Sequence, residues 1–150
     1  MPPHPTRHRR TRNNVYIHDP LSMQDNLLIL SANMNRQPNA LISILVTTDA
    51  SILLIQEPSW GRLVPKKSDD NPEGVKVKGT CAHPQWCTIL PLTSPTDPDP
   101  HITIFLCSDL TNTLTYSILP AMNSYTCLGI RLNTETPLTL INFYHHVIDK

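Results

Sequence analysis

Leu27-Leu-Ile-Leu-Ser-Ala-Asn33 is a short apolar run that ends in a polar residue. A second run of the same kind, Ser51-Ile-Leu-Leu-Ile-Gln56, is followed directly by Glu57 and Pro58. Short continuous apolar runs are typical of buried strands. The sequence therefore predicts two buried strands, one ending at Asn33 and the other ending just before Glu57.

The segment between these runs has a helical pattern of apolar residues. Residues 36–47 carry apolar side chains at i, i+1, i+4 and i+5, which predicts a helix with one buried face. The residues in that pattern are Ala40, Leu41, Ile44 and Leu45. Pro38 is compatible with the first turn of such a helix. Strand, helix and strand predict a right-handed β-α-β unit, whose strand ends would bring Asn33 and Glu57 to one ligand-binding edge.

An Asn and a Glu at one sheet edge suit a hard divalent cation beside a phosphate. Mg²⁺ prefers oxygen ligands and usually takes one or two protein carboxylates, leaving its other positions to water and substrate phosphate. An amide oxygen is too weak to hold the ion alone, so Glu57 would be the anchor. Structural interpretations stay open here: Asn33 as a turn or helix N-cap residue, Asn35 as the better cap, and Glu57 as a solvated loop charge.

The composition indicates one α+β domain. The chain has 150 residues, with fifteen Pro, four Gly and 16% charged residues. Because Pro blocks helix interiors and cannot donate to a strand ladder, short strands and irregular connections are expected rather than a helix bundle. Loops are expected at 58–73 and 93–100, and an antiparallel sheet from the later strands. Those strands are predicted at 74–79, 86–90, 102–107, 113–119, 125–132 and 138–144.

Positive charge is concentrated at the N-terminus. Residues 1–25 are predicted to be a disordered basic arm, which contains Arg7, Arg9, Arg10 and Arg12. Residues 13–150 hold eight Lys and Arg against twelve Asp and Glu, so this part of the chain is net negative and is no basic nucleic-acid cradle. The arm is either a plain terminus or a segment that touches phosphate or directs nuclear import. Its attraction to nucleic acid would be modest and salt-sensitive.

Cysteine usage and hydropathy point to an intracellular protein, with the nucleus as one expected location. Cys81, Cys87, Cys107 and Cys127 form no CxxC pair, and His83 between the first two does not complete a compact zinc module. Reduced thiols are therefore expected. No run approaches the ~18 apolar residues of a membrane span, and the N-terminus has no apolar signal region.

Three motifs in order carry a family resemblance: Asn33-Met-Asn35, Ile55-Gln-Glu-Pro58 and Ile141-Asn-Phe-Tyr144. On these motifs residues 27–148 resemble the endonuclease/exonuclease/phosphatase superfamily, and most of all the endonuclease domain of non-LTR retrotransposons. Further features of that subgroup are Trp60, the segment Asp70-Asn-Pro-Glu-Gly-Val75 and the segment His83-Pro-Gln-Trp86. Trp60 and Trp86 are equally compatible with core positions.

The resemblance implies Mg²⁺-dependent nicking of DNA. Asn33 would orient the metal–phosphate site, Glu57 would bind the metal, and Tyr144 would contact the scissile phosphate. Such enzymes hydrolyse a phosphodiester in line, with a metal ion stabilising the developing charge and a base activating water. Tyr144 is also compatible with a core or rim role, and the tandem His145 and His146 are interpreted as a solvated edge.

In that superfamily an Asp-x-Asn motif after a further strand supplies the general base and second metal carboxylate, and a Ser-Asp-His motif near the end supplies a histidine that contacts the phosphate. No Gly-Asp-Phe-Asn-like or Ser-Asp-His-like segment occurs in the 150 residues. Ser108-Asp109-Leu110 differs in its third residue, and Val147 stands where an Asn is frequent. Residues 26–150 are thus predicted to be the inactive amino-terminal half of the domain. The expected fold is an incomplete four-layer sandwich, mostly one mixed sheet, whose uncovered inner face would self-associate or bind a partner.

Two other functions remain open from the sequence. One is a non-catalytic module that binds nucleic acid or protein. The other is an active metallophosphatase that acts on small phosphoesters, against which the same absent motifs argue.

Overall fold

A computed structural model describes residues 27–63, 77–93 and 96–145. The predicted basic arm, the Asp70–Val75 segment and His146 lie outside the described residues.

The opening unit has the predicted strand, helix and strand. β1 (Ile29–Asn33) and β2 (Ile52–Gln56) pair in parallel, with Asn33 opposite Gln56. α2 (Pro38–Thr47) connects them and begins at Pro38, whose missing N–H costs nothing in a first turn. The predicted β-α-β order is confirmed.

The first sheet is completed by two later strands. β6 (Ile102–Cys107) pairs antiparallel with β2, and β5 (Trp86–Ile89) pairs antiparallel with β6, which gives the order β1-β2-β6-β5. The first five residues of β6 are buried, because both faces of this sheet are covered. These strands agree with the predicted 102–107 and 86–90.

The remaining strands form a second sheet and a separate ribbon. β7 (Tyr116–Ser124), β8 (Cys127–Leu132) and β9 (Leu138–Phe143) are an antiparallel meander, while β3 (Trp60–Leu63) and β4 (Val77–Thr80) form a two-stranded ribbon. Two predictions are wrong here. β3 lies within residues 58–73, where a loop was expected. The strand expected to begin at residue 113 begins at Tyr116, because the short helix α3 (Ser108–Thr113) precedes it.

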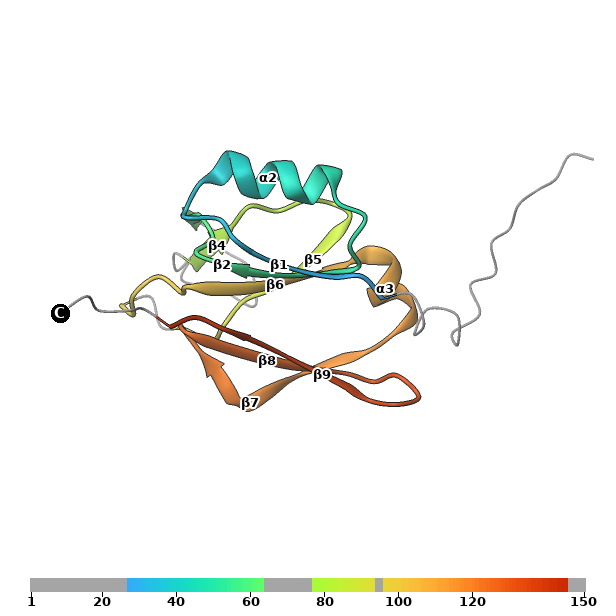
Figure 1. The fold of residues 1–150 in the computed structure, drawn as a ribbon. Helices are drawn as coiled ribbons and strands as arrows, with labels where there is room; N and C mark the ends of the chain where they lie inside the picture. The colour runs from blue at the N-terminus through green and yellow to red at the C-terminus, as the bar shows by residue number, and fades with distance from the viewer. Residues whose placement is uncertain (1–26, 64–76, 94–95, 146–150) are drawn as a thin grey trace, which may run out of the picture.

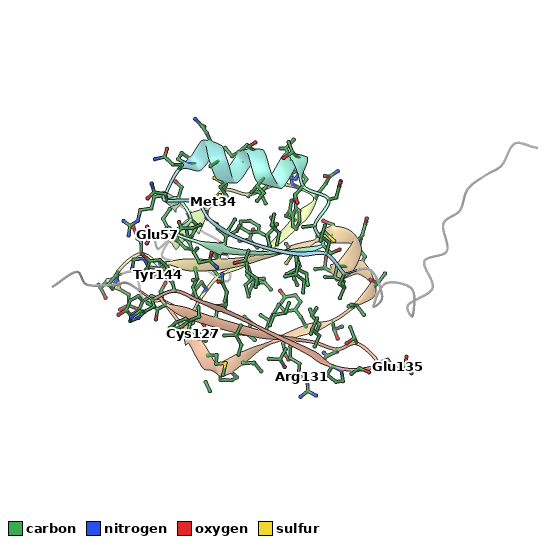
Figure 2. The ribbon with its side chains drawn as sticks, viewed as in Figure 1. Met34, Glu57, Cys127, Arg131, Glu135 and Tyr144 are labelled. Atoms are coloured by element: carbon green, nitrogen blue, oxygen red, sulfur yellow. The ribbon has the colours of Figure 1, made fainter. Side chains whose placement is uncertain are left out.

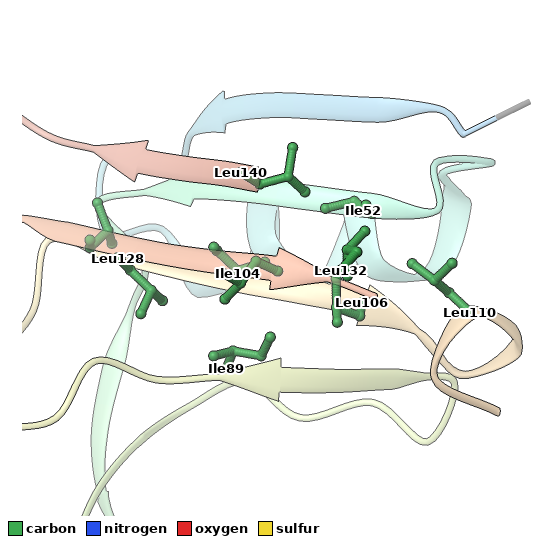
Figure 3. Close-up of a cluster of buried hydrophobic side chains, with 10 residues drawn as sticks. Ile52, Ile89, Ile104, Leu106, Leu110, Leu128, Leu132 and Leu140 are labelled. Atoms are coloured by element: carbon green, nitrogen blue, oxygen red, sulfur yellow. The ribbon is translucent and has the colours of Figure 1, made fainter. Parts of the chain in front are cut away.

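The described elements are arranged as a sheet-dominated α+β structure (Figure 1). α2 covers one face of the four-stranded sheet, and the three-stranded sheet packs against the other face. The cluster between the two sheets is drawn in Figure 3 and joins side chains from both of them. Its buried members include Ile52, Ile104, Leu106, Leu128, Ile130 and Leu132.

The expectation of mostly one mixed sheet with a bare inner face is therefore wrong for the described residues. The physical reason is that β7, β8 and β9 form their own meander and bury their inner apolar residues against β2 and β6. On the outer face of this meander, Ile141 and Phe143 are exposed.

Two further observations concern the described part of the chain. Its four cysteines are free thiols. Neither of its helices has the length and apolar content needed to span a bilayer.

Candidate active site

The ends of β1, β2 and β9 meet at one edge of the molecule. Figure 2 shows Met34, Glu57 and Tyr144 together at this edge. The backbone joins the two loops there, because the N–H of Met34 donates to the carbonyl of Gln56 at 2.9 Å and that of Arg36 to the carbonyl of Glu57 at 2.8 Å. The parallel pairing of β1 and β2 therefore places the residues that follow β1 next to the residues that follow β2.

The backbone at this edge is strained. Asn35, Arg36 and Glu57 have φ angles of 46°, 57° and 48°, and among the described residues no other non-glycine residue has a positive φ. The left-handed region costs most non-glycine residues about 1–2 kcal/mol each, although Asn tolerates it better. Strain of this kind clusters at functional sites, where the surrounding structure enforces it. The strained positions therefore mark this edge as a candidate site.

Cationic or hydrogen-donating groups surround the Glu57 carboxylate, whose side chain is 14% exposed. His101 Nδ1 lies 2.9 Å from Oε1, and Arg36 Nε lies 3.5 Å from Oε2. The Tyr144 hydroxyl also donates a hydrogen bond to this carboxylate. Three elements that are distant in sequence therefore converge on one acidic group.

These contacts change the pKa values of both acidic groups in the cluster. Burial raises the pKa of Glu57, but the hydrogen bonds from His101 and Tyr144 and the charge of Arg36 outweigh burial, so the pKa lies below its ordinary 4.5. The hydrogen bond to Glu57, with desolvation and the carboxylate's charge, raises the pKa of Tyr144. Glu57 is thus held as the ionised carboxylate and Tyr144 as the neutral phenol at neutral pH.

Asn142 positions the strand that delivers Tyr144. It is buried in β9, and its Nδ2 donates to the carbonyls of Ile55 and Thr103, each at 2.9 Å. Its Oδ1 accepts from Gln56 Nε2 at 2.7 Å. These bonds tie the second sheet to the first at the end of β2, two residues before Tyr144.

His101 is held on both sides by its backbone. Its carbonyl accepts the N–H of Glu57 at 2.7 Å, and its own N–H donates to the carbonyl of Tyr125 at 2.7 Å. The Trp60 indole donates to the carbonyl of the preceding Pro100. The imidazole stacks on the Tyr144 ring, with centroids 4.8 Å apart and planes 10° apart. His101 therefore has a fixed orientation toward Glu57.

Asn33 is at the predicted edge, but its side chain has a local structural partner. Its Oδ1 accepts the backbone N–H of Asn35 at 2.8 Å, which is an Asx turn. The helix cap is Gln37, without a side-chain cap bond, so the interpretation of Asn35 as the cap is wrong. The amide oxygen of Asn33 keeps a second lone pair, and its role toward metal and phosphate stays a prediction.

The structure brings Glu57 and Tyr144 together and places Asn33 on the neighbouring strand end, while the four arm arginines lie outside the described residues. Sequence reasoning missed Arg36, His101 and Asn142. A signal for His101 was available, since it directly precedes the apolar run 102–107. An antiparallel partner of β2 would begin where β2 ends.

The two tryptophans have structural partners. Trp86 Nε1 donates to the carbonyl of Leu45 at 2.8 Å, and its ring meets Phe105 edge to face. Trp60 anchors Pro100, as described above. Both rings therefore join separate segments of the chain. Trp86 is half-buried against the core cluster beneath α2, whereas Trp60 is half-buried and belongs to neither core cluster.

The donor set at this edge fits a hard divalent cation with few protein ligands. Glu57 supplies an ionised carboxylate, and among the described residues no three His, Cys, Asp or Glu side chains gather into a group. Mg²⁺ commonly keeps several waters and uses one or two carboxylates plus substrate phosphate. Glu57 is therefore the residue that would hold such an ion here.

Comparison with solved structures gives a weak likeness. No protein-family model matches the chain, and no curated protein matches its sequence. Among solved structures, it is similar to "Endonuclease domain of TRAS1, a telomere-specific non-LTR retrotransposon", at 18% identity and a TM-score of 0.44. The match covers 81% of this chain and 45% of that one, so this chain spans less than half the length of the matched structure.

Proposed function

We propose that this chain carries the amino-terminal half of a Mg²⁺-dependent endonuclease site of retroelement type, which cleaves phosphodiester bonds in DNA. The observation that supports this most is the convergence of Glu57 and Tyr144 from β2 and β9 on one strained edge. It agrees with the order of the three motifs that carry the family resemblance.

Each residue would have a distinct part in this proposed site. Glu57 would hold the metal through its ionised carboxylate. Tyr144, which donates to that carboxylate, would instead donate its hydroxyl to a phosphate oxygen beside the metal. Asn33 would orient the phosphate with its amide N–H groups. A bound Mg²⁺ would supply electrostatic stabilisation of the charge that develops on the phosphate oxygens.

We also propose that the 150-residue chain does not cleave DNA by itself. Among the described residues no three His, Cys, Asp or Glu side chains gather into a group, and the Glu57 carboxylate would serve as the metal anchor. The 150 residues contain no Gly-Asp-Phe-Asn-like segment, which is the source of the general base that the resemblance implies. Loss of a general base costs about 10²–10⁴-fold in rate, and loss of a second metal ligand would lower the rate further.

The proposed complete domain has a fourth layer, which the described residues do not contain. The exposed outer positions Ile141 and Phe143 support this proposal, because a covering layer would bury apolar side chains that are otherwise in water.

Two measurements on the purified chain test the proposed function. The first is a Mg²⁺ titration followed by NMR, in which the wild type should show saturable shifts at Glu57 and Tyr144 that E57Q loses. The second is nicking of supercoiled plasmid in Mg²⁺, in which the wild type should not exceed background.

E135Q is the matched control, because it removes an exposed carboxylate at the opposite end of the molecule (Figure 2). Equal Mg²⁺ affinity in the wild type and E57Q would overturn the assignment of Glu57. Mg²⁺-dependent nicking that E57Q abolishes would overturn the proposed inactivity and leave the metal site in place.

A further inference from the structure

Glu57 and His101 present two metal donors to the same point. Glu57 Oε1 and His101 Nδ1 are 2.9 Å apart. The hydrogen bond to the ionised carboxylate uses the proton on Nδ1, and the other neutral tautomer, with its proton on Nε2, has a lone pair at Nδ1 that can bind a cation. A cation bound to both atoms would take the place of the proton of this hydrogen bond and would lie beside the line that joins them.

The separation of the two atoms fits adjacent positions on an octahedral ion. Donors about 2.1 Å from the ion and at right angles lie about 3.0 Å from each other. The observed 2.9 Å therefore matches the spacing of two adjacent donor atoms on such an ion.

The imidazole is oriented before any ion binds. The backbone bonds of His101 to Glu57 and Tyr125, both 2.7 Å, fix its position, and the stacked Tyr144 ring fixes its plane. Fixed orientation of an imidazole ligand raises metal affinity.

Solvent and substrate can reach this pair. The side chains of His101 and Glu57 are 21% and 14% exposed, so water or phosphate could fill the remaining positions of an ion. Arg36 contacts the other oxygen, Oε2, and its side chain is 58% exposed. It can therefore move into solvent when a cation takes its place.

We propose that Glu57 and His101 form a mixed carboxylate–imidazole site that binds a first-row transition-metal ion in preference to Mg²⁺. This inference rests on the proposed function, because it assigns a second donor to the same metal position. An imidazole nitrogen suits borderline divalent ions, whereas Mg²⁺ prefers oxygen and gains little from nitrogen. The imidazole of His101 would thus give the site its preference for transition-metal ions, whereas the carboxylate of Glu57 would bind either kind of ion.

The test uses Co²⁺ and Mg²⁺ as probes on the full chain without a histidine tag. Calorimetry should show that H101Q lowers Co²⁺ affinity by at least about tenfold and changes Mg²⁺ affinity less than about twofold. Proton NMR of the Co²⁺ form should show strongly shifted imidazole resonances in the wild type, and H101Q should lose one set. Far-UV circular dichroism checks that each variant is folded.

H145Q is the matched control, because His145 is exposed and adjacent to Tyr144. This variant should leave the affinities for Co²⁺ and Mg²⁺ unchanged, and it should keep the shifted proton resonances of His101. E57Q should lower the affinity for both ions. Unchanged Co²⁺ affinity in H101Q, or an equal loss for both ions, would overturn the ligand role of His101 while E57Q could still support the proposed function. If E57Q weakens neither ion, the proposed function and this inference both fail.

Discussion

Glu57 combines three features that stability alone does not explain. Its backbone is left-handed, with φ 48°, its carboxylate is mostly covered, and each carboxylate oxygen faces a basic side chain. A glycine would relieve the backbone, and a glutamine would avoid burying charge. The ionised carboxylate in this strained position is what a site for a cation needs.

The pKa of Glu57 leads to a prediction about stability. Because this pKa is lowered from 4.5 in the folded chain, the ionised carboxylate stabilises the fold above about pH 4.5, and this contribution is lost as pH falls through the folded-state pKa. Urea denaturation should therefore show that the wild type loses more free energy of unfolding than E57Q between neutral pH and about pH 3.

E135Q serves again as the control for loss of one carboxylate. If the free energy of unfolding depended on pH identically in the wild type and E57Q, His101, Tyr144 and Arg36 would not stabilise the ionised form of Glu57.

At the scale of elements, the contact between β9 and β2 decides whether the site exists. Asn142 is a buried polar residue between the two sheets, and its side chain makes three hydrogen bonds to the first sheet. A buried amide of this kind fixes register, since a shift of one residue would turn Asn142 outward and move Tyr144 to the other face.

Replacement of Asn142 tests that coupling between elements. N142A should lower the free energy of unfolding by about 1–3 kcal/mol, because buried polar groups lose their partners. N142D should cost at least as much, since a carboxylate cannot donate to the two carbonyls that Nδ2 contacts at 2.9 Å. Thermal and urea denaturation measure both changes.

N112D is the control, because Asn112 is exposed in α3; it should change stability by less than about 0.5 kcal/mol. A similar small effect of N142D would show that Asn142 does not hold the sheets together.

At the scale of the whole molecule, positive charge is concentrated at one end of the sequence. The four arginines at positions 7–12 precede a net negative remainder, which includes Glu57, the proposed metal anchor. If this chain contacts DNA, the arm is therefore the segment from which charge-driven affinity is expected.

Salt dependence of DNA binding tests this expectation. A variant with Arg7, Arg9, Arg10 and Arg12 replaced by Gln keeps the length of the arm and removes its charge. If all four contact phosphate, the slope of log affinity against log salt should become less negative by about 3–4. Fluorescence anisotropy with a short duplex measures both slopes, and equal slopes would exclude the arm as the binding segment.

Much of the fold could be predicted from local pattern. The strands at 29–33, 52–56 and 102–107 and the helix from Pro38 agree with the prediction, because an apolar run or a helical period is encoded in neighbouring residues. The division of later strands into a separate sheet could not be predicted in this way, since it depends on which faces bury each other. α3 was missed because its six residues, Ser-Asp-Leu-Thr-Asn-Thr, carry no amphipathic period.

The sequence by itself determined the opening strand, helix and strand, several of the later strands and, at the candidate site, the positions of Asn33, Glu57 and Tyr144 after or at strand ends. Only the tertiary structure decided that His101 contacts one carboxylate oxygen of Glu57 and Arg36 the other, and that Asn142 joins the two sheets by hydrogen bonds. The physical reason is distance along the chain. His101 and Asn142 are 44 and 87 residues from their partners Glu57 and Ile55, and contacts of that kind form only when the sheets pack.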